Sequence, residues 1–225
     1  MNLCKQIDCV RQRIARYCHE AGRDPSEITL IAVTKSQDPA VLPMLRELGI
    51  RDFGENRVEH LQAMLAKTET GDRWHYIGRI QSRQLPKIAP YIACLHSLCD
   101  LSHAQRLYRL CCELQRRLPV FVQVNASGET TKAGIALRDV SVFLEQLRAY
   151  PTLEPVGLMT MAPELGVQAD ERTVRTCFSA TRQAAAAAGL RYLSMGMSGD
   201  YHLAILEGAT HLRLGSCLFS VSSEA

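Results

Sequence analysis

Short apolar runs, many of them rich in β-branched residues, alternate along the chain with longer stretches whose apolar positions repeat every three or four residues. The short runs predict buried strands and the longer stretches predict amphipathic helices. Eight strands in alternation with helices favour right-handed crossovers and a parallel sheet that closes into a barrel. The strands are expected at residues 28–34, 51–54, 73–77, 93–97, 119–125, 154–160, 191–195 and 211–214, and helices at 40–48, 56–67, 100–117, 138–149, 170–188 and 200–207.

A further amphipathic helix is expected within the first twenty residues, before the first strand. Asp38, Asn56 and Asp100 are expected to cap later helices, and Gly189 to end the helix that contains the alanine run. No GxGxxG motif follows the first strand and no linker-like segment divides the chain, which argues against an open doubly wound sheet. We therefore expect residues 1–225 to form a single (β/α)8 TIM barrel domain of the α/β class with an extra N-terminal helix.

Composition narrows the classes of function. The 225 residues are 47% hydrophobic and carry a net charge of +3, with 26 basic and 23 acidic residues and no basic run, so nucleic acid is not an expected partner. No apolar stretch suits a signal peptide or a membrane span, so we expect a cytoplasmic protein without membrane contacts. The nine cysteines include no CxxC pair, which favours reduced cysteines used as small hydrophobes and predicts no metal site.

Polar segments follow seven of the predicted strands. Ligands bind at the carboxyl ends of the strands in barrels of this kind, so these segments are expected to meet at one rim. Ser198 and Gly199 precede a predicted helix, and Gly215 and Ser216 follow the last strand. Because the loops after strands seven and eight commonly hold phosphate, these four residues predict a phosphate site.

Lys35 follows the first strand at the same rim. We expect its amine to be partly desolvated and its pKa lowered, as Schiff-base formation requires. A lysine beside a phosphate site indicates pyridoxal 5′-phosphate (PLP) as the cofactor. Strand alternation directs Arg213 into the barrel, where an ion pair with Glu55 is the structural alternative to a role at the cofactor.

The successive motifs resemble those of the pyridoxal phosphate homeostasis (YggS/PROSC) family, whose barrel is related to the N-terminal domain of alanine racemase. They are IAVTK, FGEN, WHYIGRIQS, VQVNASGETTKAGI, GLMTMAP, LSMGMSGD and RLGS, in order from about residue 28 to the end. The resemblance implies a PLP-binding barrel that maintains intracellular vitamin B6 (PLP) homeostasis. By this resemblance Lys35 forms the aldimine, Asn56 lies beside the cofactor, Arg213 faces the pyridine nitrogen, and Ser198, Gly199, Gly215 and Ser216 hold the phosphate.

Some positions depart from the family pattern. GRIQSRQ stands where GPLQSNK is commoner, which places Arg79, Arg83 and Gln84 at the rim, and Ser216 stands where threonine is frequent. Lys132 matches a lysine proposed to handle the cofactor in such proteins, and we interpret it as a solvated loop lysine. PLP-dependent apoenzymes are the partners that the resemblance implies.

Arg213 bears on whether the protein is an enzyme. An arginine beside the pyridine nitrogen leaves the ring a weak electron sink, and alanine racemase also needs a base from a second domain, which we do not expect in a sequence that ends at Ala225. A monomeric PLP carrier without catalytic activity is therefore favoured. The alternatives are a PLP-dependent amino acid racemase, an aldolase in which Lys35 attacks a sugar phosphate, and an interaction module with a vestigial site.

Overall fold

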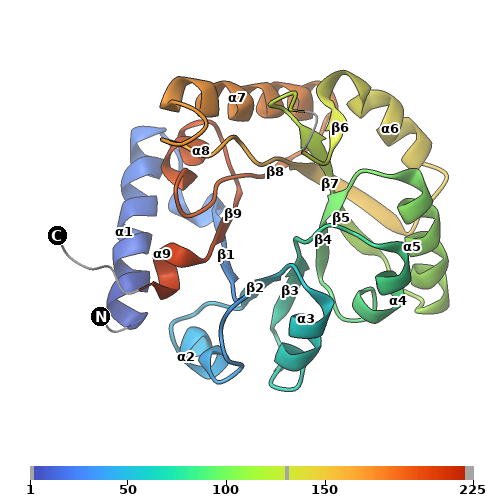
Figure 1. Ribbon diagram of the computed structural model, residues 1–225, viewed down its shortest axis with the longest axis horizontal. Coiled ribbons are helices and arrows are strands. Elements are labelled where there is room, and N and C mark those ends of the chain that lie inside the picture. The colour runs from blue at the N-terminus through green and yellow to red at the C-terminus, as the bar shows by residue number, and fades with distance from the viewer. Residues whose placement is uncertain (1–2, 130–131, 221–225) are drawn as a thin grey trace.

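The computed structural model describes residues 3–129 and 132–220, and its strands form a closed parallel barrel (Figure 1). Eight strands make the ring, in the order β4-β3-β2-β1-β9-β8-β7-β5, and pairing of β4 with β5 closes it. A further short strand, β6, pairs with the end of β5. The bounds are β1 Thr29–Val33, β2 Asp52–Glu55, β3 Arg73–Tyr76, β4 Cys94–Leu98, β5 Leu118–Asn125, β6 Ile135–Ala136, β7 Leu153–Met159, β8 Tyr192–Ser194 and β9 His211–Leu214.

Helices surround the barrel, and α1 lies beside α8 and α9 (Figure 1). The bounds are α1 Leu3–Glu20, α2 Val41–Glu47, α3 Val58–Leu65, α4 Leu85–Ile88, α5 Leu101–Glu113, α6 Val140–Leu147, α7 Glu171–Ala187, α8 Tyr201–Leu206 and α9 Ser216–Phe219, with 3-10 turns at Pro25–Glu27, Ser82–Gln84 and Leu137–Asp139. The predicted barrel and its N-terminal helix are confirmed. The short elements β6, α4 and α9 were not predicted, because runs of two to four residues carry no readable period.

Local signals set several of these boundaries. The Asp100 carboxylate accepts a hydrogen bond from the Ser102 amide and caps α5 as predicted, and Gly189 follows α7 with a φ of +68°, a left-handed conformation that glycine adopts without strain. The prediction that Asn56 caps a helix is wrong, because Arg57 occupies the N-cap position of α3 and no side chain caps that helix. Packing of the apolar face of α3 therefore fixes its start.

The space between strands and helices is apolar, whereas part of the barrel interior is polar. Phe53, Trp74 and Leu212 are almost fully buried in the outer layer. Alternating positions on the strands place buried polar side chains inside instead: Asp52, His75, His96, Ser194 and Arg213. Branched apolar residues usually fill this interior, so a polar interior marks this barrel for a role beyond packing.

The burial of the cysteines and the hydropathy of the helices bear on two expectations from the sequence. Cys18, Cys94, Cys111 and Cys177 are buried and free, in agreement with their use as small hydrophobes, whereas Cys9 and Cys112 are exposed and do not fit that expectation. Across the described ranges, no helix combines the length and the hydropathy that crossing a membrane demands.

Candidate functional site

The register of the strands brings the predicted residues together at the carboxyl end of the barrel. Val33 of β1 pairs with Gly54 of β2. Lys35 comes two residues after Val33 and Asn56 comes two residues after Gly54, so both lie at the same level of the rim. On the other side of β1, a Cβ built on Gly215 would lie 3.4 Å from the Val33 carbonyl oxygen. The turn of Lys35 therefore lies between the Asn56 segment and the Gly215 segment.

Lys35 lies in the turn after β1 and its side chain is exposed. The burial expected for this amine is therefore not found. The physical reason is that the strand ends at Val33, and the following turn carries Lys35 beyond the buried end of the barrel. The amine is accessible to a ligand that enters from this rim.

Buried groups beneath Lys35 hold its turn in place. The Thr34 hydroxyl, which is fully buried, donates a hydrogen bond to the Glu55 carboxylate. His60 of α3 lies 3.0 Å from the same carboxylate through Nδ1, and its Nε2 lies 3.1 Å from the carbonyl oxygen of Gln37. Burial raises the pKa of Glu55, while the Thr34 hydrogen bond and His60 oppose that rise.

The predicted alternative of an ion pair between Arg213 and Glu55 is wrong. Glu55 follows Gly54 by one position, so its side chain points to the outer layer, where Thr34 and His60 are its partners. Arg213 points into the barrel on the opposite side of the sheet. The two side chains therefore have separate roles, one in anchoring the turn and one inside the barrel.

Asn56 is exposed at the rim, directly after β2. The end of β3 approaches its backbone closely, because a Cβ built on Gly78 would lie 2.2 Å from the Asn56 carbonyl oxygen. The Tyr76 hydroxyl lies 3.4 Å from that same oxygen. Only glycine at position 78 permits this approach, so the segment 54–56 at the end of β2 and the segment 75–78 at the end of β3 hold one another in place.

Ser198 joins the two loops that were predicted to bind phosphate. Its Oγ accepts hydrogen bonds from the amides of Gly215 and Cys217, each at 3.2 Å. A hydroxyl that accepts two hydrogen bonds keeps its own hydrogen for donation to a third group. Ser198 is thus oriented as a donor between the loop after β8 and the loop after β9.

The neighbouring backbone is open to a ligand. Nothing lies within 4 Å of a Cβ built on Gly199, and the exposed Ser216 begins α9, where the first amides have no partner in their own helix. Asp200 accepts a 2.6 Å hydrogen bond from the Met197 amide and thereby fixes the loop after β8. The loop after β8 and the loop after β9 together form a cradle of donors suited to an anion.

Arg213 is buried, with 4% of its surface exposed, at the floor of this rim. Its guanidinium donates to Ser194 Oγ at 2.7 Å and to the Thr160 carbonyl oxygen at 3.0 Å. Burial lowers the pKa of Arg213 to about 10, and the charge of Asp200 opposes that shift. The side chain therefore remains a cation at neutral pH.

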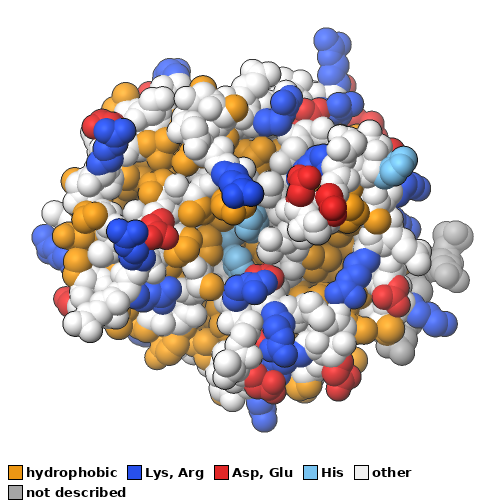
Figure 2. Space-filling model, turned by 180° about the vertical axis from the view of Figure 1, so that it is seen from behind, with side chains coloured by type: hydrophobic (Ala, Val, Ile, Leu, Met, Phe, Trp, Pro, Cys, Tyr) orange, Lys and Arg blue, Asp and Glu red, His pale blue; other side chains and the backbone are white. Residues whose placement is uncertain are grey.

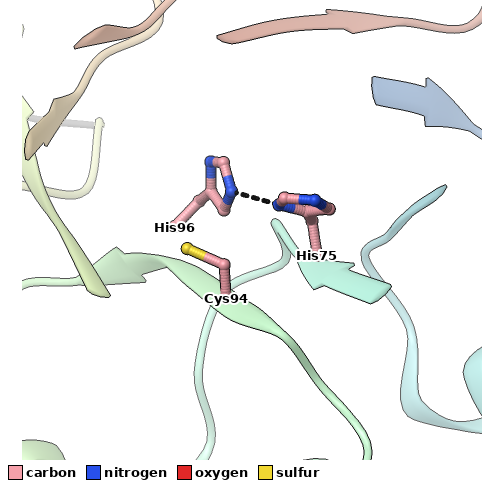
Figure 3. A group of neighbouring side chains, drawn as sticks. All are labelled: His75, Cys94 and His96. Carbon is pink, nitrogen blue, oxygen red and sulfur yellow. Dashed lines mark hydrogen bonds between the residues drawn. The ribbon is translucent and has the colours of Figure 1, made fainter. Parts of the chain in front are cut away.

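Sequence reasoning missed a chain of hydrogen bonds that continues from Arg213 through the barrel. His96 Nε2 lies 2.9 Å from His75 Nδ1 (Figure 3). On either side of this pair, His96 Nδ1 lies 2.8 Å from Ser194 Oγ, and His75 Nε2 lies 2.9 Å from the Asp52 carboxylate. Burial alone would raise the pKa of Asp52, but hydrogen bonds from His75 and Arg73 outweigh it and hold that pKa at about 2. The alternation of side chains along β3 and β4 was the signal in the sequence that could have placed His75 and His96 inside the barrel.

Cys94 lies beside the two histidines, and Figure 3 shows its sulfur on the same side of β4 as His96. One donor atom from each of His75, Cys94 and His96 lies within 4.8 Å of the others, close enough for a metal ion. However, each imidazole nitrogen already has a hydrogen-bond partner. Burial raises the pKa of the Cys94 thiol, which disfavours the thiolate that a metal would need.

The interior histidines predict that acid destabilises the fold. Burial lowers the pKa of His211 to about 4, so the folded chain resists a proton that the unfolded chain accepts near pH 6.5. As pH falls from about 6.5 to about 4, the free energy of unfolding should fall by about 3 kcal/mol from this group alone. Denaturant unfolding followed at several pH values measures this loss.

The matched variants for this prediction are His211→Gln and His19→Gln, since His19 is exposed on α1. His211→Gln should flatten the dependence of stability on pH between about 6.5 and 4, and His19→Gln should not. Parallel pH profiles for the two variants would show that His211 titrates equally in the folded and unfolded chains.

The remaining predicted residues lie around the rim. Lys132 is partly buried and forms an ion pair with Glu129 at 2.7 Å, so it is less solvated than expected. Arg79 and Arg83 are exposed, and Gln84 is half-buried, in the segment after β3. In the loop that contains Lys132, Thr130 and Thr131 lie outside the described residues.

Comparison with known proteins defines the class of this barrel. Residues 7–223 match the family described as alanine racemase, N-terminal domain. The structure of PipY from Synechococcus elongatus with PLP bound has a TM-score of 0.84 and 31% identity, covering 97% of this chain and all of that one. Alanine racemase of Clostridium difficile, at 14% identity and a TM-score of 0.75, shares the fold over 57% of its length.

Two relatives narrow the class further. The pyridoxal phosphate homeostasis protein of Pseudomonas aeruginosa is 38% identical over 223 residues, which cover 96% of this chain and 94% of the relative. The protein of the same name from Aquifex aeolicus is 32% identical over 97% of this chain and 98% of the relative. The chain belongs to the family of pyridoxal phosphate homeostasis proteins, within the alanine racemase N-terminal domain fold.

Proposed function

We propose that this protein binds PLP at the carboxyl end of its barrel and contributes to PLP homeostasis. The observation that carries the proposal is the arrangement of an accessible amine, an anion cradle and a buried cation at one rim. A structural relative, PipY, is described with PLP bound, and the relatives carry names of PLP homeostasis proteins.

The residues at the rim match the chemical groups of PLP. PLP carries an aldehyde, a phosphate and a pyridine nitrogen, which call respectively for an amine, for hydrogen-bond donors and for a group that sets the nitrogen's protonation. Lys35 offers the amine, and Ser198 with the amides around Gly199 and Ser216 offers donors. Arg213 offers a guanidinium whose charge persists at neutral pH.

Each residue has a role that follows from its surroundings. Lys35 would attach the cofactor covalently through its amine, on a turn that Thr34, Glu55 and His60 hold in place. Ser198 would donate its hydroxyl hydrogen to the phosphate while its oxygen stays fixed by the amides of Gly215 and Cys217. Asn56 would line the side of the site next to β2.

Arg213 favours a carrier over an enzyme. When bound, PLP supplies an electron sink that is strong only when its ring nitrogen is protonated. A carboxylate stabilises that protonated nitrogen by accepting its hydrogen bond, whereas a guanidinium can only donate hydrogen bonds and leaves the nitrogen unprotonated. The Ser194 and Thr160 contacts fix Arg213 as a donor. We therefore propose storage and delivery of PLP rather than racemisation.

The test compares delivery with catalysis in one preparation. Protein loaded with PLP is mixed with a PLP-dependent apoenzyme, and recovery of that enzyme's activity is followed; in parallel, L-alanine is incubated with the loaded protein and its optical purity is measured. We expect recovered activity and unchanged L-alanine. Racemisation at many turnovers per site would instead establish the amino acid racemase, and failure to bind PLP would refute the proposal.

We further propose that the protein acts as a monomer in the cytoplasm, with PLP-dependent apoenzymes as its partners. One chain supplies every residue assigned above, so the site requires no second subunit. Buried free cysteines such as Cys18 and Cys111 suit a reducing compartment. Measurement of molar mass in solution tests the monomer.

A further inference from the structure

The hydrogen bonds inside the barrel have one direction when both imidazoles are neutral. The Asp52 carboxylate only accepts, so His75 donates to it from Nε2 and keeps a lone pair on Nδ1. His96 must then donate to that lone pair from Nε2 and keep its own lone pair on Nδ1. The proton positions of both rings are thus determined by the charge at one end.

The same direction continues to Arg213. The lone pair on His96 Nδ1 can be met only by the hydroxyl hydrogen of Ser194, and the Ser194 oxygen accepts from the Arg213 guanidinium. Burial, and after it the neighbouring His75, His211 and Arg213, lower the pKa of His96 well below its usual value, in keeping with a neutral ring. Every hydrogen bond of the chain is therefore donated in the direction that leads from the Arg213 cation to the Asp52 carboxylate.

We propose that Ser194, His96, His75 and Asp52 form a relay that positions Arg213 at the cofactor site and links it to the charge at the opposite end of the barrel. This proposal rests on the proposed function, because it assigns Arg213 to the ring of PLP. The four residues are positioning residues that act through Arg213. Their directed hydrogen bonds keep the Arg213 side chain in one rotamer, which it would not hold without them.

The far end of the relay reaches the surface. Asp52 and Arg73 line a cavity of about 630 Å³ between α1 and the amino ends of β1, β2 and β3, and Arg73 donates to Asp52 at 2.7 Å. Figure 2 shows histidine side chains within a central hollow on one face of the molecule. Anything that alters the charge of Asp52 from this side would act on Arg213 through the relay.

The relay also accounts for the histidines better than a metal ion does. A metal bound between His75 Nδ1 and His96 Nε2 would replace the hydrogen bond that joins them and would need Cys94 as a thiolate. Cys94 takes no part in the relay, although it lies beside both rings. It is therefore the matched control.

The experiment begins on the protein without PLP, with 15N-labelled histidine at about pH 8. We expect NMR to show His75 and His96 protonated at Nε2 in the wild type, in Cys94→Ala and in Ser194→Ala, and both rings to lose their single defined form in Asp52→Asn, whose amide can donate as well as accept. Protonation of wild-type His96 at Nδ1 would overturn the relay. This readout stands even if PLP does not bind, which separates its failure from failure of the proposed function.

The second readout uses protein loaded with PLP. Loss of one hydrogen bond to a charged group predicts that Ser194→Ala releases PLP about tenfold faster and shifts its absorption band. Asp52→Asn should shift the band in the same direction with about a two- to threefold effect on release, since it removes the charge that orients the relay. Cys94→Ala should match the wild type.

Two outcomes would overturn the relay at this stage. One is that Ser194→Ala and Asp52→Asn both match Cys94→Ala in spectrum and release rate. The other is that purified wild-type protein contains stoichiometric zinc that Cys94→Ala lacks, which would identify the cluster as a metal site.

Discussion

Lys35→Ala is expected to abolish covalent attachment of PLP while leaving the fold intact. Lys35 lies in the turn between the Asn56 segment and the Gly215 segment, and a methyl group cannot bond to the cofactor's aldehyde as its amine can. The side chain is exposed, so the free energy of unfolding should change by less than about 0.5 kcal/mol. Absorption spectra after addition of PLP, with chemical denaturation, measure both effects.

Lys132→Ala is the matched control, because Lys132 is the other lysine that the family resemblance associates with the cofactor. Its amine already pairs with Glu129 at 2.7 Å, so its loss should leave the visible band of bound PLP intact. A band that survives Lys35→Ala and disappears in Lys132→Ala would reverse the assignment of the two amines.

Gly157→Ala is expected to destabilise the fold more than the same substitution at any other described glycine. A Cβ at Gly157 would lie 2.0 Å from the Tyr192 carbonyl oxygen and 2.7 Å from the Phe121 ring. The backbone of β8 cannot move aside without breaking its pairing with β7, so the free energy of unfolding should fall by about 3 kcal/mol. Chemical denaturation, or failure to obtain folded protein, reports this loss.

Gly199→Ala provides the comparison for Gly157→Ala. Nothing lies within 4 Å of a Cβ at Gly199, and its backbone conformation is not left-handed, so stability should be unchanged within about 0.5 kcal/mol. Equal stability of the two variants would mean that β7 and β8 separate more readily than their close approach implies.

The barrel was predictable from the sequence because its strands are buried on both faces and its helices are amphipathic. Those patterns located every strand of the ring to within two residues at each end, for example Leu118–Asn125 against the predicted 119–125. They could not locate β6 or α9, whose few residues are set by contacts with neighbouring segments. Asn56 was predicted to cap a helix because its residue type suits that role, but tertiary packing decides where α3 begins.

The site was only partly predictable. Alternation on the last strand correctly directed Arg213 inward, and spacing brought Ser198 and Gly215 to one rim. The partner of Arg213 was not predictable, because Ser194 and Thr160 lie far from it in sequence and only barrel closure makes them neighbours. The exposure of Lys35 also depended on where β1 ends, which a continuous apolar run does not show.

The measurement that tests the central claim most directly is borohydride reduction of the protein mixed with PLP, followed by proteolysis and mass spectrometry of the peptides. The account predicts one PLP-derived group per chain, on the peptide that contains Lys35. Absence of any modified peptide, or modification of a different lysine, would contradict the assignment of this rim as the PLP site.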